Sequence, residues 1–343
     1  DLYWGLRNAQ SCKMQTIYFY APGEIRQKNI KEDQTLWTGD HSNFTAWIAQ
    51  TYFHLKQAGF PCEIAGEIPE QGILIADRDT LDNDYPFLDK VMLICVQSDK
   101  EYHPSAHLHI VYNPYTWEKT KDSIWNPHLI GHWPMPGLIP RDRERNTLVE
   151  NISYIGNRGQ LAPELRSEAW RESLANLNCH WMPIWDKFQW NNYTNLDVIV
   201  AARSFDSRNY PNKGSIKLIN AWHAGVPALL TPELGFLAER KTELDFIVIH
   251  SLEEAIEAVR RLKSSPELYQ EMVENGYERA KEHTIETTLN QWMSFLKDVA
   301  FPTYDQWSAL SQLEKRWLFS QRYLAFKYDR FKHKINNLDK SEA

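Results

Sequence analysis

Cysteine is scarce in this chain, and its spacing excludes several kinds of site. The 343 residues include four cysteines. None belongs to a C-x-x-C pair, so neither a zinc site nor a disulfide framework is predicted. Cys95 ends an apolar run and is predicted to be a buried thiol. The other three are Cys12, Cys62 and Cys179.

Long apolar runs and an excess of positive charge are also missing. The sequence has no stretch of 18 apolar residues that could cross a membrane, and no signal-peptide pattern. Its formal net charge is -7 at pH 7, whereas a nucleic-acid binder would normally carry a basic domain. We therefore expect a cytoplasmic protein that does not bind nucleic acid.

The apolar residues that are present suffice for two hydrophobic cores. They make up 43% of the chain, and single cores stop growing at about 250–300 residues. A proline-rich stretch from Trp133 to Pro140 cannot form a helix or a central strand, so it is the predicted linker. The charged segment Arg141 to Arg145 follows as a solvated connector. We expect domains at 1–135 and 136–300, then a helical tail at 301–343.

Apolar runs alternate with amphipathic helical patterns in both halves, which is typical of an open α/β sheet. Ser251 with Glu254 forms a predicted capping box, and Ser265-Pro266 a predicted helix start. Strands are predicted at 16–21, 62–65, 72–76, 91–95, 108–112, 151–156, 194–202, 226–230 and 246–249. Helices are predicted from about 40 to 59, at 161–177 and at 215–223.

The segment from 209 to 237 combines a loop, a helix and a strand that suit an anionic ligand. Lys213 and Lys217 lie four positions apart around the expected helix start at Ser215. Free backbone N–H groups and the positive end of the helix dipole favour phosphate there. The preceding run 195–202 predicts a buried strand, and ligands bind at the carboxyl ends of such strands. The alternative is a solvated basic turn.

The string from Lys217 to Ala228, KLINAWHAGVPA, resembles the C-terminal-domain signature of GT-B fold glycosyltransferases. It also resembles the lysine-bearing helix of the GT-B fucosyltransferases. The segments 149–163 and 185–203 are similar to other parts of the same half. This resemblance implies two Rossmann-like domains facing a central cleft, with a nucleotide-sugar donor in the second and an acceptor in the first. It also implies that Lys217 contacts the donor diphosphate.

Further donor residues follow from the resemblance and from the predicted strand ends. Retaining GT-B enzymes commonly carry two glutamates in this unit, and here those positions are Asn212 and Asn220. Asn220 can still hydrogen-bond ribose hydroxyls, so the stereochemical outcome stays open. Arg203 follows a buried strand and can pair with phosphate bidentately. Glu233 is either a contact to the donor sugar or a plain surface acid. The loop predicted to face the cleft contains Asn157, Arg158 and Gly159.

Acceptor activation is expected from the first half. Asp40 and His41 lie where a long loop meets its helix, and histidine suits proton transfer near neutral pH. Asp40 is alternatively a helix N-cap. The run from Asp77 to Asp79 has a D-x-D form but is predicted to be a polar turn, so no metal or other cofactor is expected. His128 and His132 flank the predicted linker and are further candidates to line the cleft; the alternative is that they are hydrogen-bonded scaffolding.

The tail from 313 to 335 is both basic and aromatic. Between 315 and 334, four lysines and three arginines oppose one acid. We expect a helix that packs back on the first half, with its lysines solvated. The alternative is an amphipathic helix making peripheral contact with an anionic membrane, which would suit lipid-linked or envelope sugars.

The predicted function is glycosyl transfer. A nucleoside diphosphate sugar would be the co-substrate and a glycan, lipid-linked or small-molecule hydroxyl the acceptor, without a metal. The same architecture serves nucleotide-sugar 2-epimerases, so an isomerase is the enzymatic alternative. The missing glutamate pair leaves a catalytically silent GT-B scaffold as the other alternative.

Overall fold

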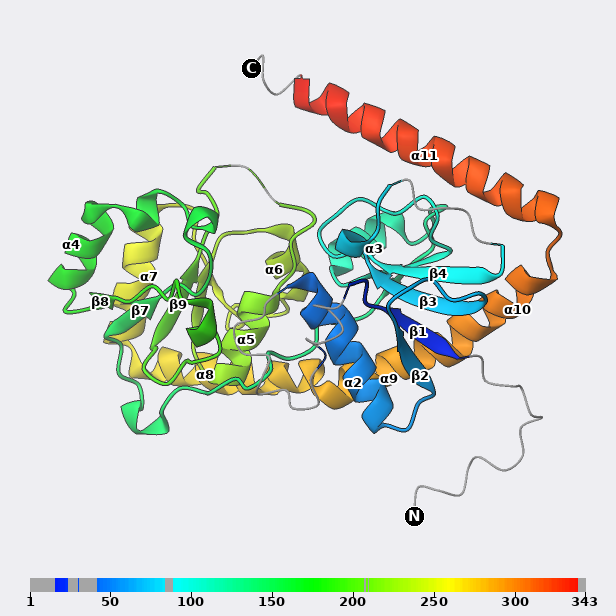
Figure 1. Cartoon of the computed structure of the whole chain (residues 1–343). Helices are drawn as coiled ribbons and strands as arrows, with labels where there is room; N and C mark the ends of the chain where they lie inside the picture. The colour runs from blue at the N-terminus through cyan, green and yellow to red at the C-terminus, as the bar shows by residue number, and fades with distance from the viewer. Residues whose placement is uncertain are drawn as a thin grey trace.

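The chain forms two parallel β-sheets with helices packed around them (Figure 1). The computed structural model describes residues 16–23, 30, 42–83, 89–206, 208 and 210–338. The first sheet has six strands in the order β2-β1-β3-β4-β5-β6, and the second has five in the order β11-β10-β9-β7-β8. The prediction of two α/β units is confirmed.

The central strands β3, β4 and β5 of the first sheet are buried on both faces, whereas the edge strands β2 and β6 are partly exposed. Every residue of β3 and β4 is buried, as continuous apolar runs in a parallel sheet require. The predicted strands agree to within one residue at each end, and Cys95 is fully buried as expected. The strands are β1 (Ile17–Tyr20), β2 (Cys62–Ala65), β3 (Gly72–Asp77), β4 (Val91–Val96), β5 (Leu108–Val111) and β6 (Pro127–Leu129). The helical segments are η2 (Phe44–Ala49), α2 (Gln50–Gln57), η3 (Arg78–Thr80) and α3 (Pro114–Thr120).

The second sheet has shorter strands than its sequence predicts. Gly225 ends α5 with φ 70°, the left-handed conformation that favours glycine at a helix C-terminus. The strands are β7 (Asn151–Ser153), β8 (His180–Trp181), β9 (Val198–Ala201), β10 (Ala228–Leu230) and β11 (Ile247–Val248). The α-helices are α4 (Glu168–Asn176), α5 (Ile216–Ala224), α6 (Leu234–Glu239), α7 (Leu252–Ser264) and α8 (Pro266–Ala280). The short turns are η4 (Arg143–Arg145), η5 (Arg158–Gln160), η6 (Glu164–Arg166), η7 (Lys187–Gln189) and η8 (Lys281–His283).

Two predicted helix starts need correction. The helix predicted at 161–177 begins only at residue 168, because the Ser167 side chain caps it by accepting from the Trp170 N–H. Ser251 caps α7 as predicted. The carboxylate of Glu254, however, accepts from the N–H of His250 rather than that of Ser251.

The connector at 141–145 is only partly solvated as predicted: residues 142–144 are exposed, but Arg141 and Arg145 contact a buried acid. Arg141 is 7% exposed and Asp197 is fully buried. Arg141 Nη2 lies 2.8 Å from Asp197 Oδ1, and Arg145 Nη2 lies 2.7 Å from Oδ2. The backbone N–H groups of Glu150 and Asn151 also donate to Asp197. Burial alone would raise the pKa of Asp197, but these hydrogen bonds outweigh it and lower that pKa.

The last helices return the chain to the first sheet (Figure 1). Trp292, Phe295, Tyr304 and Trp307 pack in the hydrophobic core of that sheet. None of the described helices is long and apolar enough to span a bilayer. The elements are α9 (Ile285–Phe295), η9 (Leu296–Ala300), α10 (Phe301–Ala309) and α11 (Gln312–Leu338).

Candidate functional site

Three strand ends of the second sheet bring polar side chains to one edge. Tyr154 and Gly156 follow β7, Arg203 follows β9, and Glu233 follows β10. Lys217 joins them from the first turn of α5, the helix after β9. Because the strands are parallel, their carboxyl ends share an edge, which is where open α/β sheets bind ligands.

The ammonium group of Lys217 is held against the end of β7. Its Nζ donates to the Ile155 carbonyl and lies 4.7 Å from the Tyr154 ring centroid. Burial, and then the nearby Arg203, lower the pKa of Lys217 to about 8. Gly156 has φ +145°, and a Cβ there would lie 2.6 Å from Nζ. Glycine at 156 therefore makes room for the charged group.

Arg203 is oriented by three neighbours at the same edge. It forms an ion pair with Glu233, and its Nε lies 3.3 Å from Gln160 Oε1. Its guanidinium carbon lies 5.6 Å from the Tyr210 ring centroid. Burial raises the pKa of Glu233, an effect that Arg203 opposes. With Lys217, two cations surround one carboxylate, so the cluster favours an anionic ligand such as a diphosphate.

The loop after β7 lies at the rim of this cluster. Asn157, Arg158 and Gly159 are all exposed. The Tyr154 hydroxyl donates to the Asn157 carbonyl over 3.2 Å, which ties the loop to the cluster. The space beside Gly159 is open, so the loop is accessible to a ligand.

Lys213 and Ser215 are engaged elsewhere. Lys213 pairs with Asp99 of the first sheet's unit, and Ser215 Oγ donates to Glu239 over 3.0 Å. Asn113 Nδ2 also donates to the Lys213 carbonyl over 2.8 Å. The loop at 210–214 is thereby fastened to the first unit, and its lysine is separate from the Lys217 cluster.

A cavity of about 260 Å³ lies between the two units. Lys217 reaches it from the second unit, so the cluster and the cavity are contiguous. Asn220 is buried one helical turn further along α5 and lines the same cavity. The remaining lining residues are Asn43, Ala46, Trp47, Gln50, Tyr112, His132, Trp133, Met135, Pro136, Ile155, Trp190, Tyr193, Ile199 and Ile216.

His132 contributes a polar atom to this cavity. Its ring centroid lies 4.3 Å from that of Tyr112 and 4.7 Å from that of Trp47. Its Nε2 is buried and has no hydrogen-bond partner among the described residues. Burial lowers the pKa of His132 to about 3, so the ring is neutral near pH 7. A neutral imidazole here can donate to or accept from a bound hydroxyl.

The predicted acceptor bases Asp40 and His41 lie outside the described residues. The chain resumes at Ser42, and Asn43 lines the cavity. The structure therefore brings the chain to the cavity two residues after His41, while the two side chains remain predictions.

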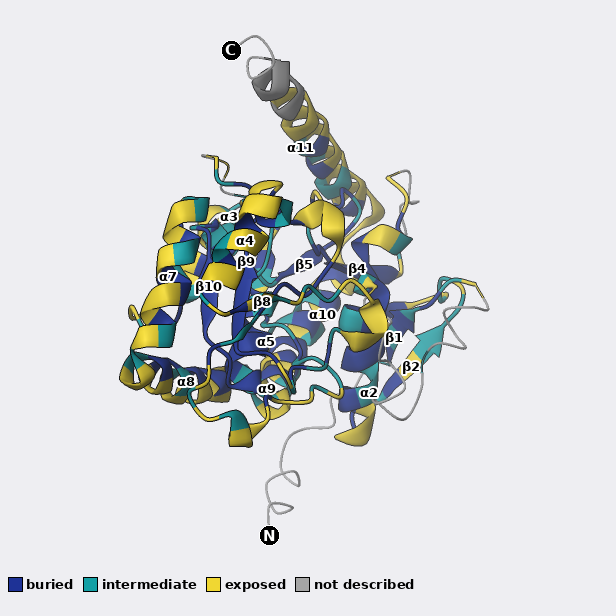
Figure 2. Cartoon of the chain, turned by 90° about the vertical axis from the view of Figure 1, so that its left-hand side faces the viewer, coloured by how far each residue is buried: buried dark blue, intermediate teal, exposed yellow. Residues whose placement is uncertain are grey.

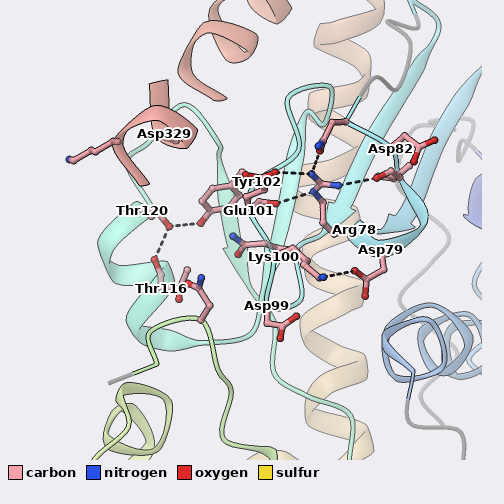
Figure 3. Close-up of a pocket in the computed structure, with 15 residues that line it drawn as sticks. Arg78, Asp79, Asp82, Asp99, Lys100, Glu101, Tyr102, Thr116, Thr120 and Asp329 are labelled. Atoms are coloured by element: carbon pink, nitrogen blue, oxygen red, sulfur yellow. Dashed lines mark hydrogen bonds and ion pairs between the residues drawn. The ribbon is translucent and has the colours of Figure 1, made fainter. Parts of the chain in front are cut away.

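A larger hollow of about 820 Å³ opens on the first unit (Figure 3). Four of its charged groups pair with one another. Arg78 Nη2 lies 3.6 Å from Glu101, and Lys100 Nζ lies 3.4 Å from Asp79. Asp77 accepts from the Asp79 N–H and caps η3, the arrangement of a polar turn. No group of three metal-type ligands is found within the described ranges.

An aromatic residue that the sequence did not single out lies beside the cluster. Trp185 follows β8, is 37% exposed, and has its ring centroid 5.7 Å from that of Tyr154. The available signal was the aromatic-rich segment at 181–193. An exposed indole next to a phosphate-type cluster can stack against a nucleobase.

Known proteins resemble this arrangement. Residues 148–294 match the family model described as glycosyl transferase-like. The chain has no significant match among curated proteins. The solved sucrose-phosphate synthase from Thermosynechococcus elongatus superposes with a TM-score of 0.54 at 12% identity, covering 84% of this chain and 100% of that one. HepE from Anabaena, in complex with UDP and glucose, gives 0.50 at 10% identity, covering 83% and 100%.

These similarities define the class of fold. Two parallel α/β sheets that match a glycosyltransferase structure over most of the chain constitute the GT-B fold. The Lys217 cluster lies within residues 148–294, the part of the chain that matches the glycosyl transferase-like family model. The predicted fold and the stated resemblance are confirmed.

Proposed function

We propose that this protein transfers a sugar from a nucleoside diphosphate donor to an acceptor hydroxyl. The observation that carries the proposal is the Lys217–Arg203 cluster at the carboxyl edge of a glycosyl transferase-like domain, contiguous with the cavity between the two units. The donor diphosphate would contact both cations. The acceptor, a carbohydrate or lipid-linked hydroxyl, would enter from the first unit.

The residues of the cluster and the cavity would have different roles in the transfer reaction. Glycosyl transfer leaves negative charge on the departing diphosphate, and preorganised cations stabilise that charge as it develops. Lys217 and Arg203 would do this without a metal ion. Asn220, buried in the cavity, would contact the ribose, and Glu233 the hydroxyls of the transferred sugar. His132 would position a hydroxyl through Nε2.

The two sheets also support a division of the chain. We propose that the first unit binds acceptor and the second binds donor, with α9 to α11 returning to the first. An isomerase would turn over the nucleotide sugar without any acceptor, and a silent scaffold would neither transfer nor slowly hydrolyse it. Product analysis with and without acceptor separates these three cases.

The function is tested by measuring thermal stability with UDP, GDP, ADP, dTDP and CMP, each with and without Mg²⁺. A ligand that binds only the folded state raises its melting temperature. We expect one nucleoside diphosphate to raise it regardless of Mg²⁺, which would also identify the donor class. No shift with any of them would contradict donor binding.

Trp185→Ala is expected to weaken binding of that nucleoside diphosphate. Stacking of a base on an aromatic side chain contributes about 1–3 kcal/mol, equivalent to roughly 5- to 150-fold in affinity. Calorimetric titration measures the change, and Phe188→Ala, three residues further along the same loop, is the matched control. Unchanged affinity in the Trp185 variant would rule out the stacking role.

His41→Gln is expected to lower turnover while leaving nucleotide affinity intact. A positioned general base typically contributes about 10²- to 10⁴-fold to the rate. Asp40→Ala separates the two interpretations of Asp40: loss of a catalytic group lowers turnover, whereas loss of a helix N-cap lowers the melting temperature. Wild-type turnover in both variants would remove these residues from the mechanism.

A further inference from the structure

The helix α11 has an apolar stripe on the side that faces away from the protein. Its inward side is anchored, since Lys315 Nζ donates to the Asp89 carbonyl and Arg322 to the His107 carbonyl, while Phe326 is 3% exposed. The opposite side carries five large side chains that are 63–79% exposed. We call these the outer stripe: Leu313, Trp317, Leu324, Tyr328 and Phe331.

The spacing of the outer stripe places it on one face of the helix. Successive members are separated by four, seven, four and three residues, which keeps them in line at 100° per residue. Figures 1 and 2 show α11 at the outside of the fold, and in Figure 2 it projects beyond the body with exposed residues along it. A broad flat partner can therefore reach the whole stripe.

Positive charge flanks the outer stripe. Arg316, Lys327 and Lys332 are exposed on α11, in a chain whose net charge is -7. The two acids of this helix are engaged by the protein itself. Glu314 accepts from Ser311, and Asp329 accepts from the Trp125 indole over 3.2 Å. The outward face is thus apolar and cationic.

We propose that the outer stripe of α11 binds the surface of an anionic lipid bilayer. Helices with Lys and Arg beside Trp, Phe and Leu lie in the membrane interface, with the apolar side chains inserted at the headgroup boundary. Tryptophan and tyrosine suit that boundary, because each has an apolar ring and a polar atom. The cations then face lipid phosphates. The helix lies along the surface and does not cross it.

Charge disfavours a second copy of the chain as the occupant. If two outer stripes packed together, Lys327 and Arg316 of each copy would approach the same cations of the other. Asp329 faces the protein through its hydrogen bond from Trp125, so it would not compensate the repulsion. Ser320 also interrupts the stripe between Trp317 and Leu324. An anionic bilayer supplies both the apolar layer and the opposite charge.

The test is co-sedimentation of the full chain with vesicles of phosphatidylglycerol and phosphatidylcholine, compared with phosphatidylcholine alone. The wild type is expected to bind the anionic vesicles, and to bind them less at high salt. The triple variant Trp317→Ser, Leu324→Ser, Phe331→Ser is expected to bind at least tenfold more weakly. A second variant, Arg316→Gln with Lys327→Gln, is expected to lose the preference for anionic lipid.

The matched control changes three exposed apolar residues outside α11, Leu148, Phe188 and Ile285, to serine. It is expected to sediment like the wild type. The proposal is overturned if the wild type ignores anionic vesicles, or if the stripe variant binds them normally. It is also overturned if light scattering shows that the stripe variant converts a dimer to a monomer without changing vesicle binding. No nucleotide is used, so the outcome is independent of the proposed transfer activity.

Discussion

Lys217→Ala is expected to weaken nucleoside diphosphate binding by about 1.5–3 kcal/mol, or roughly 10- to 150-fold, the range for a hydrogen bond to a charged group. The reason is the position of Nζ, which the Ile155 carbonyl and the Tyr154 ring hold at the edge where a diphosphate would lie. The melting temperature without ligand should change little. Isothermal titration with the nucleotide found in the ligand panel measures the loss.

The pH dependence of binding gives an independent signature of the same residue. Lys217 must be protonated to bind the diphosphate, and its pKa in the free protein is lowered to about 8. Affinity is therefore expected to be full below pH 8 and to fall as the pH rises above it. The Lys217→Ala variant should lack this fall between pH 7 and 9. Lys241→Ala, an exposed lysine paired with Glu282, should match the wild type.

Asp197→Ala is expected to lower the stability of the second unit by about 3–5 kcal/mol, the cost of leaving buried charged partners unpaired. The carboxylate is fully buried and holds Arg141, Arg145 and two backbone N–H groups. Urea unfolding followed by circular dichroism measures the loss.

The control for this variant is Glu150→Ala. Glu150 lies 4.0 Å from Arg145 but its side chain is 44% exposed, so its removal should cost no more than about 1 kcal/mol. Because the folded pKa of Asp197 is lowered, its stabilisation is present above its unfolded pKa of about 3.9 and is lost as the pH falls through the folded value. Equal destabilisation by both variants would contradict the role of the buried network.

Much of the fold could be predicted from local sequence pattern. Strands such as those at 72–76 and 91–96 are continuous apolar runs, and burial on both faces produces that pattern. The helix starts at Ser251 and Ser265 could also be predicted, because a capping side chain hydrogen-bonds to backbone N–H groups nearby in sequence. The strands of the second sheet were predicted too long, since apolar residues continue beyond the paired segments.

Contacts between residues far apart in the sequence could not be predicted from local sequence pattern. The charged string at 141–145 looks solvated until Asp197, 56 residues beyond Arg141, is known to lie against it. Likewise, Lys213 looks like a phosphate ligand, but its ion-pair partner Asp99 lies 114 residues earlier. Local sequence pattern indicates which charged groups can bind an ionic ligand. The tertiary structure determines which of these groups already pair with a charged side chain of the protein.

The candidate site could be predicted only in part, because local pattern locates strand ends but not the contacts between distant segments. Arg203 and Glu233 could be placed at a ligand-binding edge because each follows a predicted strand, and parallel strands end at a common edge. Trp185 was missed because the strand before it, β8, has only two residues. The cavity next to Lys217 depends on how two sheets meet, and no local pattern encodes that.

The loop at 210–214 belongs in sequence to the second unit but is fastened to the first unit by Asn113, Thr116 and the Lys213–Asp99 pair. It also lies between Arg203 and Lys217 in the chain. A ligand that shifts one sheet relative to the other would therefore move both Arg203 and Lys217. Thermodynamic linkage would then make donor and acceptor mutually cooperative, each changing the other's affinity by the same factor.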